Sequence, residues 1–234
     1  MPTSRSYRDS CGIARALDVV GERWALLVVR ELLLTPQRFS ELRHALPHVS
    51  SNVLADRLRE LEQNGVVRRG PAAAQGSAEG SGSGSAEAPQ VYELTERGRG
   101  LEPIVLALGE WGIDAPQPAP PAALSATSVL IFLRGAARLD PAQPPTACRL
   151  ELDGRAWTAR VKGGRVQVQP GEPARAQASL RTDPHTFSAL LIDPGALETR
   201  SAAGDVAVVG DVELIRTLLK AVSEPWQPEA RAAD

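Results

Sequence analysis

Cysteine is scarce in this chain, whose 234 residues include only Cys11 and Cys148, far apart in the sequence. Two thiols exclude a disulfide framework and are too few for a zinc site built from cysteines. This low number is consistent with a protein of a reducing compartment. Long apolar runs are missing as well: no stretch approaches the roughly 18 apolar residues of a membrane helix, and the first ten residues lack the apolar core of a secretory signal. We therefore expect a soluble cytoplasmic protein.

A surplus of positive charge is also lacking, with 26 Lys and Arg against 28 Asp and Glu. The chain as a whole therefore does not attract nucleic acid or anionic membranes, and DNA binding has to come from local clusters of arginines. His44, His48 and His185 do not have the spacing of metal ligands, and no Gly-x-Ser-x-Gly motif stands between a strand and a helix. We therefore expect that the protein is not an enzyme and that it has neither a cofactor nor a metal site.

Two stretches divide the chain. Residues 70–89, GPAAAQGSAEGSGSGSAEAP, are too rich in Gly, Ser and Ala to pack, and they predict a flexible loop. Residues 115–123, APQPAPPAA, predict a proline-rich linker. We therefore expect one domain over residues 1–114 and a second over residues 124–226.

The patterns before the linker are mostly helical. CGIARALDVVG, RWALLVVRELLL and RFSELRHAL predict three helices, and a fourth runs from a cap at Ser50 or Ser51 to about Asn64, with Gly65 closing it. VVRRG and QVYELT, on either side of the flexible loop, predict the strands of a hairpin. ERGRGLEPIVLALGEWG predicts a final helix, weakened near its start by two glycines and a proline.

The fourth helix has an apolar face and a polar face. Leu54, Leu58 and Leu61 fall within a narrow arc, and the residues opposite them are polar. On an isolated helix such a polar face is usually just solvated. Here, however, the helix follows a short helix across a three-residue turn and precedes a hairpin with arginines in its first strand. That order predicts a winged helix-turn-helix, with the fourth helix in the major groove of double-stranded DNA.

The residues that this geometry directs toward DNA lie at the start of the fourth helix, along its polar face and in the first hairpin strand. They are Ser50, Ser51, Asn52, Ala55, Arg57, Arg59, Arg68 and Arg69. Arg57 lies at the edge of the apolar arc and suits either a phosphate contact or an intramolecular ion pair. Arg68 and Arg69 can reach a phosphate or the minor groove. Asp56 opposes DNA binding unless it pairs with Arg59 or accepts a hydrogen bond from a cytosine.

Residues from about Cys11 to Gly112 resemble the HxlR family of bacterial winged-helix transcription regulators. The resemblance lies in CGIARALDVVGERWALLVVRELLL, RFSELRHALPHVSSNVLADRLRELEQNGVVRR and YELTERGRGL. It implies a homodimer that binds operator DNA, with the first helix and the helix ending near Trp111 forming the dimer interface. It favours repression over activation. The wing of this chain departs from the family in its long tip, rich in glycine and serine.

Cys11 has two interpretations. The resemblance places it where some members carry a thiol that senses oxidants or electrophiles, and Arg15 at helical spacing can favour the thiolate. A small apolar residue at the start of a helix is the more common meaning of a lone cysteine.

The second half changes character to α+β. SATSVLIFLRGAARL predicts a helix, and ACRLELD, RAWTARV, RVQVQ and AQASLRT predict strands of an antiparallel sheet. Asp153-Gly154 and Gly163-Gly164 supply tight turns between strands. Asp183 caps a further helix with Pro184 at its first position, and a last helix starts at Asp211.

This half is similar to the sterol-carrier-protein fold, through ASLRTDPHTFSALL and VVGDVELIRTLL above all. The resemblance implies an apolar tunnel for a lipid or another hydrophobic small molecule. Its walls would come from seven apolar residues, which can equally form a filled core: Phe132, Trp157, Phe187, Leu190, Leu191, Leu214 and Leu218.

The leading hypothesis is a dimeric bacterial regulator that binds an operator with two half-sites and responds to a hydrophobic ligand. The alternative is a hydrophobic-ligand carrier or sequestering protein whose N-terminal half only dimerises. The operator, the regulated genes and the ligand stay open at this point, as does the sign of regulation.

Overall fold

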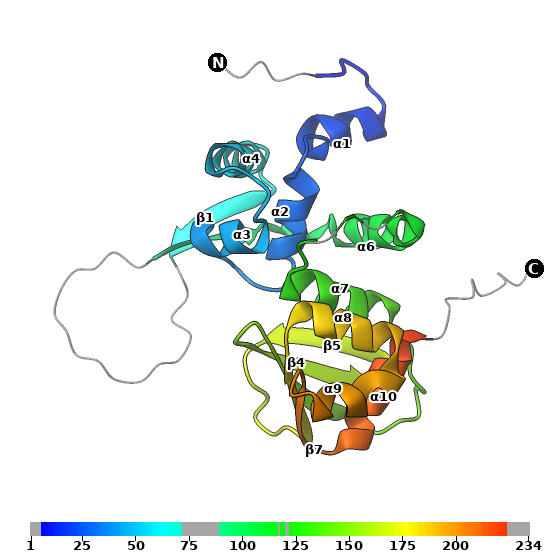
Figure 1. The fold of residues 1–234 in the computed structure, drawn as a ribbon. Coiled ribbons are helices and arrows are strands. Elements are labelled where there is room, and N and C mark those ends of the chain that lie inside the picture. Colours follow the sequence, from blue (N-terminus) through cyan, green and yellow to red (C-terminus); the bar gives the residue numbers. More distant parts are fainter. Residues whose placement is uncertain (1–5, 72–88, 117, 120–121, 224–234) are drawn as a thin grey trace, which may run out of the picture. The chain divides into compact units, whose positions relative to one another are not determined.

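The computed structural model describes residues 6–71, 89–116, 118–119 and 122–223 of the chain. These residues form two compact units, divided between Ala123 and Leu124 (Figure 1). Most of the loop predicted over residues 70–89 lies outside the described residues, as do three residues of the predicted linker and the predicted domain end at residue 226.

The first unit contains the winged helix-turn-helix that the sequence predicts (Figure 1). Its helices are α1 (Gly12–Val20), α2 (Ala25–Leu32), α3 (Phe39–Ala45), α4 (Ser51–Gln63), α5 (Glu96–Arg99) and α6 (Glu102–Trp111), followed by the 3-10 turn η1 (Gly112–Asp114). Strands β1 (Val67–Pro71) and β2 (Gln90–Leu94) pair antiparallel, with Val67 opposite Leu94. The order of α3, a short turn, α4 and a hairpin confirms the predicted motif.

Helix α2 lies in the core of this unit and packs against α3, α4 and β2. Its side chains Ala25, Val28, Val29 and Leu32 are buried, at the spacing of one helical face. Leu42 of α3 is also buried and lies in the same core. The helix-turn-helix therefore rests on the buried face of α2, which gives α4 a rigid support.

The prediction of one final helix over residues 96–112 is wrong in one respect, because the structure divides this segment into α5 and α6. Thr95 caps α5 by accepting a hydrogen bond from the N–H of Gly98 at 3.0 Å. A Cβ on Gly98 would lie 2.1 Å from the carbonyl oxygen of Val66, so glycine lets this turn press against the wing. Pro103 then stands in the first turn of α6, where the proline nitrogen needs no hydrogen-bond partner.

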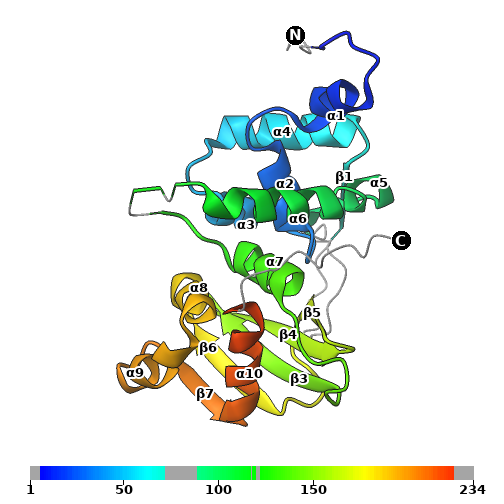
Figure 2. The ribbon, with the colours of Figure 1, turned by 90° about the vertical axis from the view of Figure 1, so that its right-hand side faces the viewer.

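The second unit packs helices on one face of a five-stranded sheet (Figure 2). Its helices are α7 (Ala126–Ala136), α8 (Pro184–Ile192), the 3-10 turn η2 (Pro194–Ala196), α9 (Leu197–Ala202) and α10 (Val212–Ser223). Its strands, in the sheet order β5-β4-β3-β6-β7, are β5 (Arg165–Pro170), β4 (Arg155–Lys162), β3 (Thr146–Leu152), β6 (Ala178–Thr182) and β7 (Ala207–Gly210).

The prediction of an antiparallel sheet is wrong for one pair, since β3 and β6 run parallel. Residues 171–177 carry the chain from the end of β5 back across the sheet, so that Ala178 begins β6 beside Cys148 near the start of β3. The remaining pairs are antiparallel. Both predicted tight turns are present, with positive φ at Asp153, Gly154, Gly163 and Gly164.

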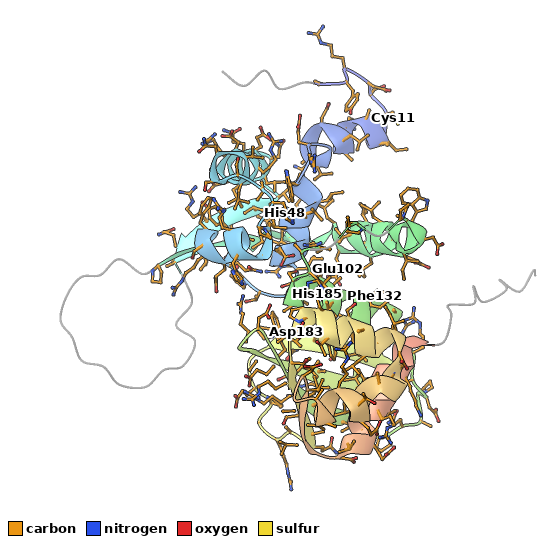
Figure 3. All side chains as sticks on the ribbon, in the orientation of Figure 1. Cys11, His48, Glu102, Phe132, Asp183 and His185 are labelled. Carbon is orange, nitrogen blue, oxygen red and sulfur yellow. The ribbon has the colours of Figure 1, made fainter. Side chains whose placement is uncertain are left out.

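The sheet of the second unit has one apolar face and one polar face. Cys148 and Leu150 of β3 and Trp157, Ala159 and Val161 of β4 are buried on the face that α7, α8 and α10 cover (Figure 2). Alternate residues on these strands point to the opposite face and carry most of the charges. Asp183 caps α8 as predicted, accepting hydrogen bonds from the N–H groups of His185 and Thr186 (Figure 3).

Candidate nucleic-acid interface

Helix α4 is held from one side by the three leucines that the sequence placed in one arc. Leu54, Leu58 and Leu61 are each at most 1% exposed. Ser50 caps the helix by accepting a hydrogen bond from the N–H of Val53 at 3.3 Å. Burying three leucines on one side leaves the helix no freedom to rotate about its axis, so the direction of its polar face is set by the core.

The exposed side of α4 presents the residues expected at base edges. Ser51 and Asn52 are exposed in the first turn, and Ala55 is half-buried one turn later. Arg59 is exposed a further turn along the helix. The first turn of the polar face is thus small and uncharged, and a groove can approach its backbone closely.

Arg59 does not stand alone on this face. Its guanidinium donates a hydrogen bond to the Asp56 carboxylate at 2.7 Å, an ion pair between residues one turn apart. Both side chains are more than half exposed. This pairing is the first of the two arrangements under which the sequence made Asp56 compatible with DNA. It also means that Arg59 must leave a carboxylate before it meets a phosphate or a base.

The exposed residues Ser51, Asn52, Asp56 and Arg59 form a stripe along α4, and Arg57 points away from this exposed stripe. Its side chain is 14% exposed and forms ion pairs with Glu60 at 2.7 Å and with Glu22 at 3.5 Å. Of the two roles left open for Arg57, the structure shows the intramolecular ion pair. Its guanidinium links α4 to the segment between α1 and α2, which helps to fix the orientation of α4.

The wing arginines are paired as well. Arg68 stands opposite Glu93 in the hairpin and forms an ion pair with it at 2.8 Å. Arg69 lies over the ring of Tyr92, its cross-strand neighbour, at 5.1 Å, and approaches Glu62 of α4 at 3.6 Å. Both arginines are about half exposed or more.

Each arginine predicted to contact DNA therefore has a carboxylate partner, and sequence reasoning missed most of these acids. The cross-strand register pairs Glu93 with Arg68, and Glu62 at the end of α4 reaches the wing. The hairpin register was the one signal that pointed to Glu93. The face that carries Asn52 and Arg59 is close to neutral overall, which limits its attraction for any duplex regardless of sequence.

Cys11 stands at the N-cap of α1, exposed and free of disulfide bonds (Figure 3). The backbone N–H groups of Ala14 and, less strongly, of Ile13 lower the pKa of its thiol. The lowering comes from the helix N-terminus rather than from Arg15, which the sequence had suggested. Cys148, in contrast, is buried in the second unit, and burial raises the pKa of its thiol to about 11.

In the second unit, the structure places six of the seven predicted pocket residues in the core between the sheet and the helices. These are Trp157, Phe187, Leu190, Leu191, Leu214 and Leu218. Phe132 on α7 differs, because 37% of it is exposed (Figure 3). The indole N–H of Trp157 is buried and has no hydrogen-bond partner among the described residues.

Two features are absent from the residues that the structure describes. No group of three or more His, Cys, Asp and Glu side chains within them is arranged to hold a metal ion. No helix within them has the length and apolar character needed to cross a membrane.

The first unit is similar to known regulators. The sequence model of HxlR-like helix-turn-helix proteins matches residues 19–119. The HTH-type transcriptional regulator YvaP of Bacillus subtilis is 37% identical over 102 residues, which cover 43% of this chain and 82% of YvaP. YodB, an HTH-type transcriptional regulator of the same organism, is 33% identical over 98 residues, 41% of this chain and 76% of YodB. A solved structure of the redox regulator HypR in its oxidized form is 32% identical and covers 46% of this chain and 100% of that chain, with a TM-score of 0.39.

The pairing of Asp56 with Arg59 leads to a test on the affinity for duplex DNA. Asp56→Asn keeps the shape of the side chain but removes its charge, so Arg59 loses its ion-pair partner and the repulsion of phosphates falls. We expect duplex affinity to rise roughly three- to tenfold and to depend more steeply on salt, as measured by fluorescence anisotropy.

Glu213→Gln is the matched control, because Glu213 forms the same kind of ion pair one turn from Arg216 on α10 in the second unit. It should leave duplex affinity unchanged. An equal rise in both variants would mean that only net charge matters, and no rise in Asp56→Asn would show that Arg59 does not meet the duplex.

Proposed function

Because the chain belongs to the family of HxlR-like helix-turn-helix transcriptional regulators, we propose that it binds an operator as a homodimer through the exposed stripe of α4. The observation that carries this proposal is the stripe itself: Asn52 and Arg59 face outward from a helix that three buried leucines hold. The wing lies next to it, with Arg68 and Arg69 on its first strand.

The roles of these residues differ by chemistry. The Asn52 amide can donate and accept hydrogen bonds at the edge of an adenine, and Arg59 can donate two hydrogen bonds to a guanine. Arg69, held over Tyr92 on the wing, is placed for a backbone phosphate, which carries no sequence information. Specificity then comes from α4, and part of the general affinity comes from the wing.

Gel shifts on operator and random duplex test this division. Asn52→Ala and Arg59→Ala should each weaken operator binding by about 1–3 kcal/mol with a smaller loss on random duplex, whereas Arg69→Ala should lower both affinities and reduce the salt dependence. Equal losses on the two duplexes for all three variants would contradict the assignment.

Dimerisation is supported by apolar side chains that the first unit leaves exposed. Ile13 and Leu17 lie one turn apart on α1 and are 73% and 42% exposed. Ile104, Leu108 and Trp111 follow one another on a single face of α6, and Trp111 is 80% exposed. Contiguous apolar faces of this kind mark interaction sites. A second copy of the chain would bury them and would place two α4 helices on half-sites about one helical turn, roughly 34 Å, apart.

The replacement of one exposed aromatic tests the interface. Trp111→Glu puts a charge into the proposed contact, and we expect it to cost about 2 kcal/mol or more, roughly a 30-fold weaker dimer, by sedimentation velocity. Ile192→Glu is the control, because Ile192 is 78% exposed but lies in the second unit. A dimer that persists in Trp111→Glu would rule out α6 as the interface.

Cys11 supports a second role for the same protein, the sensing of oxidants or electrophiles. Its thiol is exposed, and the N-terminus of α1 favours the thiolate, which is the form that attacks peroxides and quinone-type electrophiles. It also stands on a helix of the proposed dimer interface. A modification there can change the geometry of the dimer and with it the spacing of the two recognition helices.

Oxidation experiments separate this role from a structural one. Operator affinity of the parent should change after treatment with peroxide, Cys11→Ser should not respond, and Cys148→Ala should respond like the parent because Cys148 is buried. Since the pKa of Cys11 is lowered, its alkylation rate should reach half-maximum below the ordinary thiol value of about 8.5. A parent as unresponsive to peroxide as Cys11→Ser would eliminate the sensing role.

For the second unit, we propose a sterol-carrier-like domain that takes a hydrophobic small molecule between its sheet and its helices. The unpartnered indole N–H of Trp157 supports this, because a buried donor without an acceptor costs about 1–3 kcal/mol and a ligand carbonyl or hydroxyl would satisfy it. Such a ligand would regulate by preferring one dimer geometry, with a typical coupling of about 1–3 kcal/mol.

The rival function is a hydrophobic-ligand carrier that only dimerises through its first unit. Native mass spectrometry of the purified full chain, combined with the gel shifts above, separates the two. A co-purified apolar compound together with operator binding supports the ligand-responsive regulator. The same compound without operator binding supports the carrier, and operator binding without any compound supports a regulator whose second unit only packs.

A further inference from the structure

The polar face of the sheet in the second unit contains a depression of about 440 Å³. It lies over β3, β4 and β5, on the side opposite the helices. Ala147, Arg160 and Gln167 stand side by side there, one from each strand, because the register pairs Arg160 with both of the others. The small side chain of Ala147 leaves space open beside Arg160.

Three cations surround this depression. Arg160 and Lys162 project from the same face of β4, two residues apart, and Arg175 comes from the segment that crosses back toward β6. In the part of the chain that the structure describes, none of the three forms an ion pair or a side-chain hydrogen bond. Each keeps its full set of N–H donors available.

Two acids near the depression are already paired with another arginine. Glu151 and Glu172 both pair with Arg149, at 2.8 Å and 3.0 Å. The residues that line the depression include no acid. Three positive charges without a counter-charge in one hollow repel one another, and an anion would remove that repulsion.

Gln177 adds a fixed polar group at the edge. Its side-chain amide oxygen accepts a hydrogen bond from the backbone N–H of Ala147 at 2.9 Å, and its backbone N–H donates to the carbonyl oxygen of Ala147 at 3.0 Å. These two bonds fix the position of the amide, and its NH₂ group has no hydrogen-bond partner among the described residues. A built group of this kind distinguishes the depression from a surface that merely carries lysines and arginines.

We propose that this depression binds a small oxyanion with two or more negative charges, carried by phosphate or carboxylate groups. Guanidinium groups match both kinds of oxygen with paired hydrogen bonds, and the volume is that of a small-molecule site. This site is separate from the interior proposed for a hydrophobic ligand and from the α4 stripe.

Calorimetric titration of the full chain, without DNA, tests the site with inorganic pyrophosphate for the phosphate source and citrate for the carboxylate source. We expect at least one of them to bind with one site per chain and to raise Tm. The double variant Arg160→Gln/Arg175→Gln should weaken that binding on the order of tenfold or more. Arg181→Gln is the matched control, because Arg181 lies on the same sheet face, on β6 opposite Glu151, without lining the depression.

Several outcomes would overturn the proposal. The proposal fails if the parent binds neither anion. It also fails if Arg181→Gln loses as much anion affinity as the double variant, because that would show general electrostatic attraction. If the double variant lost affinity for random duplex but the parent bound neither anion, the depression would belong to a DNA surface. Lys162→Gln is a second variant that should weaken anion binding with an unchanged Tm of the free protein, in case the double variant folds poorly. None of these readouts depends on operator binding.

Discussion

The burial of three leucines behind α4 is the interaction on which the DNA-binding interpretation depends. A fully buried leucine contributes about 1.5–3 kcal/mol, so Leu54, Leu58 and Leu61 together hold the helix far more strongly than any contact on its outer side. Because they lie in one arc, they determine the rotation of α4 about its axis. That rotation decides which residues can meet a base, and it places Asn52 and Arg59 outside.

The outer face of the first unit is governed by weaker forces. Exposed ion pairs such as Arg59 with Asp56 and Arg68 with Glu93 contribute about 0–1 kcal/mol each. They give way easily when a phosphate competes for the guanidinium, whereas the leucine contacts do not. The protein thus combines a rigid helix with arginines whose partners can be exchanged. A nearly neutral face of this kind favours recognition of particular bases over general attraction to DNA.

The second unit divides its chemistry between the two faces of one sheet. Alternation along β4 sends Trp157 and Ala159 into the core beneath the helices and sends Arg160 and Lys162 to the other side. We propose an apolar ligand for the first environment and an anion for the second. Both are proposals about the same strands, and each rests on a different set of side chains, so either can fail without the other.

Local patterns determined most of the elements of this protein. The leucine arc of α4, the Ser50 cap, the hairpin strands and the glycine turns of the second unit all follow from spacing and backbone preference over a few residues. Three features came only from the tertiary structure: the parallel pairing of β3 with β6, the carboxylate partners of the wing arginines Arg68 and Arg69, and the depression around Arg160. Each depends on which distant segments become neighbours, since a crossing connection, a cross-strand register and a hollow between strands join residues that no local period relates. The sequence by itself therefore determined which way α4 faces, and the fold decided which carboxylates the wing arginines beside it meet.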